Sequence, residues 1–304
     1  MKKIFFTLAA LVLAFTGCSQ EEDAIQVSEK KAIKVVVNMD KPGFGEDTRA
    51  PRTEWVAGDQ VVVALFNDSE IYKNACIKLI YTIIEGKGAW TTVFWENGAN
   101  TSSSVFINNL IDKFAVDGDV KAAYFSSGIH SLTFEESAMD ITTFASLDKK
   151  GECIMTCEDG TYKFEGTADE YVLTLNITMK PQVAQFTIKD LDIADDWNVY
   201  AEGPFNLYAG GTITSAGVEL TPLSEGVFVY CYDNEDGISF YVAPWQSEAD
   251  MPDDYDGEYS ANYLFNVYND DVDTERTFPF TQVAIGGAVI FDGPTTDASK
   301  WEFY

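Results

Sequence analysis

The chain has 304 residues with 49 acidic and 20 basic side chains, which gives a formal net charge of −29 at pH 7. Such an acidic surface repels phosphate backbones, so nucleic acid is a very poor partner. Hydrophobic residues make up 46% of the chain and aromatic residues 14%, enough to bury a core and to exclude a disordered chain. The length suggests two domains.

The first residues have the pattern of a secretory signal. Two lysines precede an apolar run that ends at Thr16, and the small residue Gly17 comes directly before Cys18. A charged start, a short apolar middle and a small residue at the cut are typical of a signal peptide. The run is shorter than the ~20 residues of a membrane-spanning helix. We therefore expect residues 1–17 to be removed.

The segment after the signal is predicted to form a detachable edge strand followed by a turn-rich link to the next strand. Ala32 to Met39 alternates between apolar and polar residues, which is the pattern of a half-buried strand. A turn-rich link runs from Lys41 to Arg52 and contains two of the three arginines. Trp55-Val56-Ala57-Gly58-Asp59 then leads into an apolar strand from Val61 to Phe66.

Short strands separated by turn residues dominate the rest of the chain. We predict strands at 105–107, 120–125, 171–177, 185–188, 228–232, 238–242, 263–268 and 283–291. Phe134 to Met139 is predicted as a short helix, and Gly151 to Thr167 as an irregular polar stretch that ends at a domain boundary near Asp169. Many short strands without a repeat period predict an all-β fold made of sandwiches.

The cysteines after the signal give no disulfide framework of a small secreted domain. They are Cys76, Cys153, Cys157 and Cys231. In an extended strand Cys153 and Cys157 would lie ~13 Å apart, too far for a disulfide or a shared ion unless a turn intervenes. Since the chain has one histidine, His130, we predict structural thiols and no metal site.

No set of residues with catalytic spacing is present in the sequence. There is no Gly-x-Ser-x-Gly elbow and no Gly-rich phosphate loop after a strand, and carboxylate pairs arise by chance among 49 acids. The acid-dense segments Asp253 to Glu258 and Asp270 to Glu275 lack the glycine and closing glutamate of a calcium loop. We predict neither enzyme activity nor a cofactor.

Several spaced motifs resemble the fimbrillin-like (type V pilin, Mfa-like) family. They are Trp55-x-x-Gly58-Asp59, Ala122 to Phe125, Val172 to Ile177 followed by Val183 to Phe186, and Ile238 to Pro244. Gly17-Cys18 resembles the lipobox of bacterial lipoproteins, with Cys18 as the lipid-bearing residue and Phe15 in place of the usual leucine. The acidic residues 21–23 look like a surface-export tag.

This resemblance implies two tandem transthyretin-like Greek-key β-sandwich domains, at residues 31–169 and 170–304, behind an acidic tether at 18–30. It implies a fimbrial (type V pilus) subunit, or an accessory, tip or anchor component, that carries palmitate and is anchored in the cell outer membrane. Such a protein is exposed at the cell surface or incorporated in fimbriae. Its partners would be other fimbrial subunits in a homo- or heteropolymer, with host or bacterial surface ligands for adhesion.

In that family an arginine-specific protease removes an N-terminal segment, and a neighbour's strand fills the vacated groove. Here Arg49 and Arg52 are the expected processing sites. The displaceable strand would carry one apolar row, Ile33, Val35, Val37 and Met39. Four fully buried side chains contribute ~6–12 kcal/mol at most, against ~5–15 kcal/mol for a whole domain. The alternative is that the arginines are solvated loop charges and the strand is permanent.

The C-terminal tail limits the role. Asp292 to Tyr304 places only Trp301 and Phe303 on one strand face, and if Val283 to Phe291 completes the second sandwich, little remains to donate. An accessory, tip or anchor role is then favoured over a stalk role.

The alternative function is that of a surface glycan-binding lipoprotein. Trp95, Trp245 and Trp301 lie beside turn signals, where an indole ring could stack on a sugar. Aromatic residues in β-proteins more often belong to the core, because their large apolar surface contributes most when it is buried.

Overall fold

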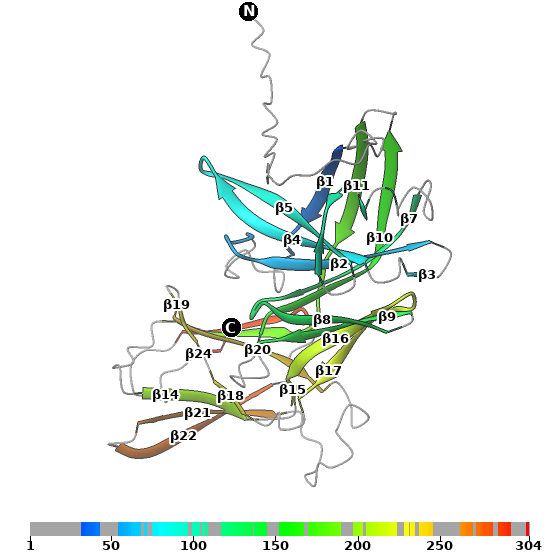
Figure 1. Ribbon diagram of the computed structural model, residues 1–304. Coiled ribbons are helices and arrows are strands. Elements are labelled where there is room, and N and C mark those ends of the chain that lie inside the picture. Colours follow the sequence, from blue (N-terminus) through cyan, green and yellow to red (C-terminus); the bar gives the residue numbers. More distant parts are fainter. Residues whose placement is uncertain are drawn as a thin grey trace, which may run out of the picture. The chain divides into compact units, whose positions relative to one another are not determined.

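The computed structural model describes most of the chain from Ala32 onward (Figure 1). The described residues are 32–42, 54–67, 70–71, 75–96, 99–103, 105–106, 108, 117–135, 137–144, 152–166, 170–189, 197–202, 205–223, 228–230, 232–234, 237–245, 262–269, 272–281, 285–292 and 302–303. The predicted signal and tether, with Gly17 and Cys18, lie outside them, as do Arg49, Arg52, Cys231 and Trp301. Within this described part, no helix is both long and apolar enough to cross a membrane.

The described residues form an all-β structure, as predicted, in which one sheet has ten strands. These are β1 (Ala32–Asp40), β2 (Gln60–Asn67), β3 (Glu70–Ile71), β4 (Ala75–Ile84), β5 (Lys87–Glu96), β6 (Ala99–Thr101), β7 (Asp117–Phe125), β10 (Ile154–Gly166), β11 (Glu170–Thr178) and β12 (Lys180–Pro181). Their main order is β1-β11-β10-β7-β2-β4-β5-β6, while β3 pairs with β2 and β12 with β10. The strand β1 therefore lies at one edge of this sheet.

Three smaller sheets contain the other strands. The first has the order β17-β16-β9-β8, from β8 (Ile129–Glu135), β9 (Ala138–Thr143), β16 (Tyr208–Thr214) and β17 (Gly217–Pro222). The second joins β13 (Ala184–Lys189), β15 (Phe205–Asn206), β19 (Tyr232–Asn234), β20 (Gly237–Pro244), β23 (Ala288–Asp292) and β24 (Glu302–Phe303). The third has the order β18-β14-β21-β22, from β14 (Trp197–Glu202), β18 (Phe228–Tyr230), β21 (Asn262–Asn269) and β22 (Val272–Thr281).

The buried core explains why β2 is apolar along its length. Val61 to Phe66 are all buried, which is unusual for a strand with one solvated face. Met139 of β9 and Ile213 of β16 belong to the same buried cluster as β2, so apolar side chains from another sheet reach this core. The strand consequently has apolar neighbours on both faces.

Three local sequence predictions are wrong. Phe134 to Met139 is not a helix, because it contains the end of β8 and the start of β9, which pair as a hairpin. Residues 105 and 106, predicted as a strand, are helical, and the amide N of Phe106 donates to the carbonyl O of Ser102 at 3.1 Å. The stretch predicted as irregular contains β10, whose Tyr162 and Phe164 alternate with exposed residues.

Pairing across residue 169 occurs in two sheets. The strand β11 lies between β1 and β10, and β9 pairs with β16. The described strands belong to one compact unit that begins at Lys31. The division into residues 31–169 and 170–304, and the number of Greek-key sandwiches, stay predictions.

Substitution of Gly210 by alanine should disrupt the pairing of β9 with β16. Gly210 has a φ of +150°, and a Cβ there would lie 1.9 Å from the carbonyl O of Ile141. We expect a loss of about 2 kcal/mol or more in the free energy of unfolding, because one backbone must move away from the other. Urea denaturation measures it.

The matched control is Gly86→Asn at the β4–β5 turn. Gly86 has a φ of +76° and nothing within 4 Å of the position of a Cβ, and asparagine tolerates this conformation. A Gly210→Ala loss no larger than that of the control would contradict a close approach of β9 and β16.

Candidate functional site

The predicted displaceable strand is present as β1, which pairs with β11 in parallel. The register joins nine residue pairs, from Ala32 with Glu170 to Asp40 with Thr178. The row formed by Ile33, Val35, Val37 and Met39 is half-buried and packs against the core cluster, next to buried Leu173 and Leu175 of β11. The face predicted from alternation is therefore the face that contacts the core.

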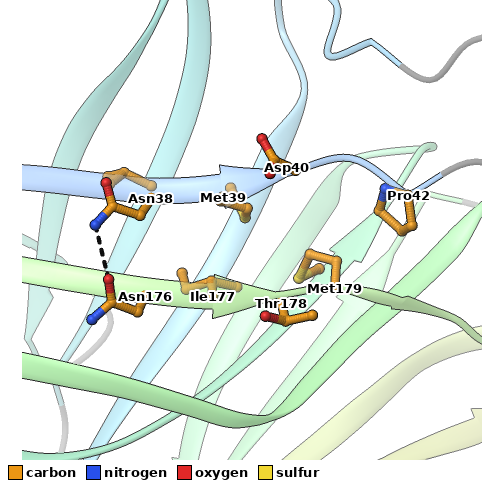
Figure 2. Close-up of a pocket in the computed structure, with 9 residues that line it drawn as sticks. Asn38, Met39, Asp40, Pro42, Asn176, Ile177, Thr178 and Met179 are labelled. Atoms are coloured by element: carbon orange, nitrogen blue, oxygen red, sulfur yellow. Dashed lines mark hydrogen bonds between the residues drawn. The ribbon is translucent and has the colours of Figure 1, made fainter.

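The opposite face of β1 meets solvent and carries a side-chain link. The side-chain Nδ2 of Asn38 donates to Oδ1 of its register partner Asn176 at 2.8 Å, as Figure 2 shows. An open pocket of about 660 Å³ lies at the carboxyl end of β1 and is lined by Met39, Asp40 and Pro42 together with the end of β11 (Figure 2). This end of the strand therefore has free space beside it.

Lys41 follows β1 directly and is buried. Its Nζ lies 3.2 Å from Oδ2 of Asp59, and the two side chains are 7% and 8% exposed. Nζ also lies 3.5 Å from the hydroxyl of Tyr124, and 4.9 Å from the ring centroids of both Trp55 and Tyr124. We call Trp55, Asp59 and Tyr124 the lysine box.

A tight turn places Asp59 in this box. The amide N of Asp59 donates to the carbonyl O of Val56 at 3.0 Å, and Gly58 has a φ of +99°. This positive φ at the third position of a four-residue turn is the reason for glycine there. The Asp59 carboxylate accepts the amide N of Val56 at 2.9 Å and the hydroxyl of Tyr124 at 2.9 Å. The motif Trp55-x-x-Gly58-Asp59 is thus a turn that holds a carboxylate in place.

Aromatic rings fix the walls of the lysine box without help from β1. Trp55 lies edge-on to Trp90 and to Tyr124, with centroids 5.0 and 5.2 Å apart, and Tyr81 is edge-on to Trp90 at 5.1 Å. Burial raises the pKa of Tyr124 far above its usual range, so its hydroxyl stays a proton donor to Asp59. The box is therefore a preformed site for an ammonium group.

Of the site residues predicted from the sequence, the structure describes the apolar row of β1, which lies beside β11. Arg49 and Arg52 belong to the link outside the described residues. Sequence reasoning missed Lys41, Asp59 and Tyr124 as a group. The signal was available in part, since Asp59 closes a Trp-x-x-Gly-Asp motif, but no spacing rule connects it with Lys41.

Three of the cysteine candidates and Trp245 are buried, whereas Trp95 is half-buried. Cys76, Cys153 and Cys157 are free, and burial raises the pKa of Cys76 and of Cys153 to about 12, which keeps both thiols protonated. Trp245 is 4% exposed and its Nε1 donates to Oδ1 of Asn206 at 3.1 Å. Its ring is therefore not available to stack on a sugar.

Among the residues described, no group of three or more His, Cys, Asp or Glu side chains could hold a metal ion. His130 is exposed on β8 with its ring edge-on to Phe144 at 5.0 Å.

A second buried carboxylate, Glu152, is held by hydroxyl and amide donors. Its side chain accepts from the amide N and the hydroxyl of Ser127 and from Oγ1 of Thr143, the last at 3.0 Å. Burial raises its pKa to about 7, and the hydrogen bonds from Ser127 and Thr143 offset part of that effect. Glu152 joins the turn after β7 to the end of β9.

Substitution of Lys41 by methionine should destabilise the protein by about 3–5 kcal/mol, because it leaves Asp59 buried without its cation. The control Lys34→Met removes an exposed lysine of β1 and should change the free energy of unfolding by less than about 0.5 kcal/mol. Chemical denaturation measures both. The double variant Lys41→Met with Asp59→Asn should lose less than Lys41→Met alone, and an equal or larger loss would contradict a charge-based role.

Glu152 should make stability fall as the pH rises from 4.5 to about 7. Since its folded-state pKa lies above its ordinary value of 4.5, the folded state holds a proton that the unfolded state releases in this window. The free energy of unfolding, relative to the Glu152→Gln variant, should decrease by about 3 kcal/mol across it. Denaturation of both proteins at a series of pH values measures the difference, and a flat difference would be contrary to this expectation.

No protein-family model and no curated protein matches the sequence. Among solved structures, a proposed cell adhesion protein of Bacteroides ovatus is 16% identical, with a TM-score of 0.41 over 90% of this chain and 95% of that chain. A fimbrial assembly protein of Parabacteroides distasonis is 13% identical, with a TM-score of 0.38 over 88% and 92%. The fimbrial anchor protein Mfa2 of Porphyromonas gingivalis is 9% identical, with a TM-score of 0.35 over 89% and 95%.

These neighbours are fimbrial and adhesion proteins, the class that the sequence motifs resemble. Identities and TM-scores this low carry no conclusion about what this chain does.

Proposed function

We propose that this chain is a cell-surface fimbrial or adhesion subunit, lipid-anchored in the outer membrane through Cys18, that assembles by strand exchange at the β1 groove. Cleavage at Arg49 or Arg52 separates β1 from the body, and a strand of another subunit takes its place between β11 and solvent. The single observation that carries this proposal is that β1 is an edge strand joined to the body by a link with two of the three arginines.

The pairing of β1 supports its exchange. Among the described strands of this sheet, β1 has one neighbour, β11, so its removal breaks one ladder and opens one edge. An open sheet edge has unpaired N–H and C=O groups that pair readily with another chain. The vacated groove would also leave Leu173, Leu175 and Ile177 uncovered on their β1 side.

The burial energy of the β1 side chains supports replacement of β1 by another strand rather than its loss alone. Full burial of one aliphatic side chain contributes about 1.5–3 kcal/mol, and the four row residues of β1 are half-buried, so together they contribute about 3–6 kcal/mol. This is a large part of the ~5–15 kcal/mol that stabilises a domain. A subunit that has lost β1 is thus driven to bind another strand.

The end of the chain supports an accessory, tip or anchor role. The strand β23 pairs in parallel with β13, and Glu302–Phe303 pairs with β23 as β24. Residues 302 and 303 are therefore paired within the chain's own sheet and are not free to pair with a neighbouring subunit. A subunit that uses this segment internally does not donate it to a polymer.

Cleavage with an arginine-specific protease should make β1 exchangeable. The test uses the Arg276→Lys variant, in which Arg49 and Arg52 are the two remaining arginines. After cleavage and brief exposure to mild denaturant, the protein should capture a fluorescent peptide of residues 31–42, measured by anisotropy and gel filtration. The uncleaved protein should not, because its own β1 stays tethered at a high effective concentration.

The control is the same protein with Arg49→Lys and Arg52→Lys, treated with the same protease. Failure of the cleaved protein to capture the peptide, or equal capture by the uncleaved control, would refute strand exchange at this groove.

A further inference from the structure

Lys41 differs from the other lysines whose ion pairs are described. Lys163 pairs with Glu165 and Lys180 with Asp159, and all four of these side chains are more than half exposed. Such pairs are worth little, since water screens them. Both side chains of the Lys41–Asp59 pair are buried. Because water cannot solvate the Asp59 carboxylate there, loss of the Lys41 ammonium costs far more than loss of a partner in a surface pair.

The two halves of this pair lie on opposite sides of the link. Lys41 comes directly after β1, whereas Trp55, Asp59 and Tyr124 belong to the body. Departure of β1 therefore removes the ammonium and leaves the lysine box in place, with Asp59 still bonded to Val56 and Tyr124. The box would then hold a buried carboxylate between two aromatic faces and without a cation.

An incoming strand can restore the box only with a positive charge at the place of Lys41. A neutral side chain would bury the Asp59 carboxylate unpaired, while an ammonium regains the ion pair and the two ring faces. By contrast, the pocket of about 660 Å³ beside Met39, Asp40 and Pro42 tolerates side chains of other sizes at the strand end. The box fixes both the identity of one residue and the register of the strand.

The chain's own tail does not meet this requirement. Its one lysine, Lys300, has Ala298 and Thr296 at alternate positions in one direction, and Glu302 and Tyr304 in the other. Neither direction gives the apolar row that β1 places before Lys41. Residues 292–304 therefore do not match the pattern of β1 and Lys41 that the groove holds.

We propose that the lysine box is a specificity site: the strand that replaces β1 carries a lysine at the position of Lys41, two residues beyond its last core-facing apolar residue. This inference rests on the proposed strand exchange. It adds the chemical identity of one residue of the partner and the register in which that partner binds.

The test uses the cleaved Arg276→Lys protein and labelled peptides of residues 31–42. The peptide with Lys41→Met should bind at least tenfold more weakly than the native peptide, and the control peptide with Lys34→Met should bind within twofold. A peptide of residues 292–304 should bind at least a hundredfold more weakly. On a body with Asp59→Asn, the native and Lys41→Met peptides should bind within twofold of each other.

The outcomes separate the two proposals. Equal binding of the native and Lys41→Met peptides to the unchanged body would overturn the specificity site while strand exchange stands. Tight binding of the peptide of residues 292–304 would overturn the requirement for a lysine placed two residues after an apolar row. If none of the peptides binds the cleaved protein, strand exchange itself fails, and the inference fails with it.

Discussion

The buried ion pair between Lys41 and Asp59 is the interaction on which the edge strand β1 depends. Asp59 lies in the body, and its ammonium partner Lys41 arrives with the N-terminal strand. Because an unpaired buried charge is costly, separation of β1 from the body destabilises the body unless both the charge and the strand are replaced. The pair thus couples the position of β1 along the sheet to the interior of the protein.

Besides the Asn38–Asn176 hydrogen bond, β1 makes three kinds of interaction with the body, and each has a different selectivity. The ladder with β11 is made by backbone groups and accepts any strand sequence. The apolar row accepts any aliphatic or similar side chain of suitable size, since the hydrophobic effect is non-directional. The lysine box accepts one kind of group. In the proposed strand exchange, affinity for a strand would come mainly from the first two interactions, and the identity and register of the strand from the third.

The well-predicted strands are those with a clear local pattern. Alternation in β1, and continuous apolar runs in β2 and β7, mark strands without any knowledge of the fold. The strand β10 was missed because a bulge between Cys157 and Gly160 breaks its alternation. The sequence predicts a helix at the β8–β9 hairpin because the turn between the two strands is short, so the apolar residues on its two sides look like one helical pattern. The turn at Glu85-Gly86 also lacks the usual asparagine or aspartate, so β4 and β5 were not predicted.

The sequence alone determined the strand class of the fold, the core-facing row of β1 and the arginine-bearing link that follows it, because these depend on side-chain period and composition within a few residues. Only the tertiary structure decided that β1 runs parallel to β11 at a sheet edge, and that Lys41 meets Asp59 and Tyr124. Parallel pairing and a buried ion pair join residues far apart along the chain, and no local pattern encodes which distant strand or charge will be the neighbour.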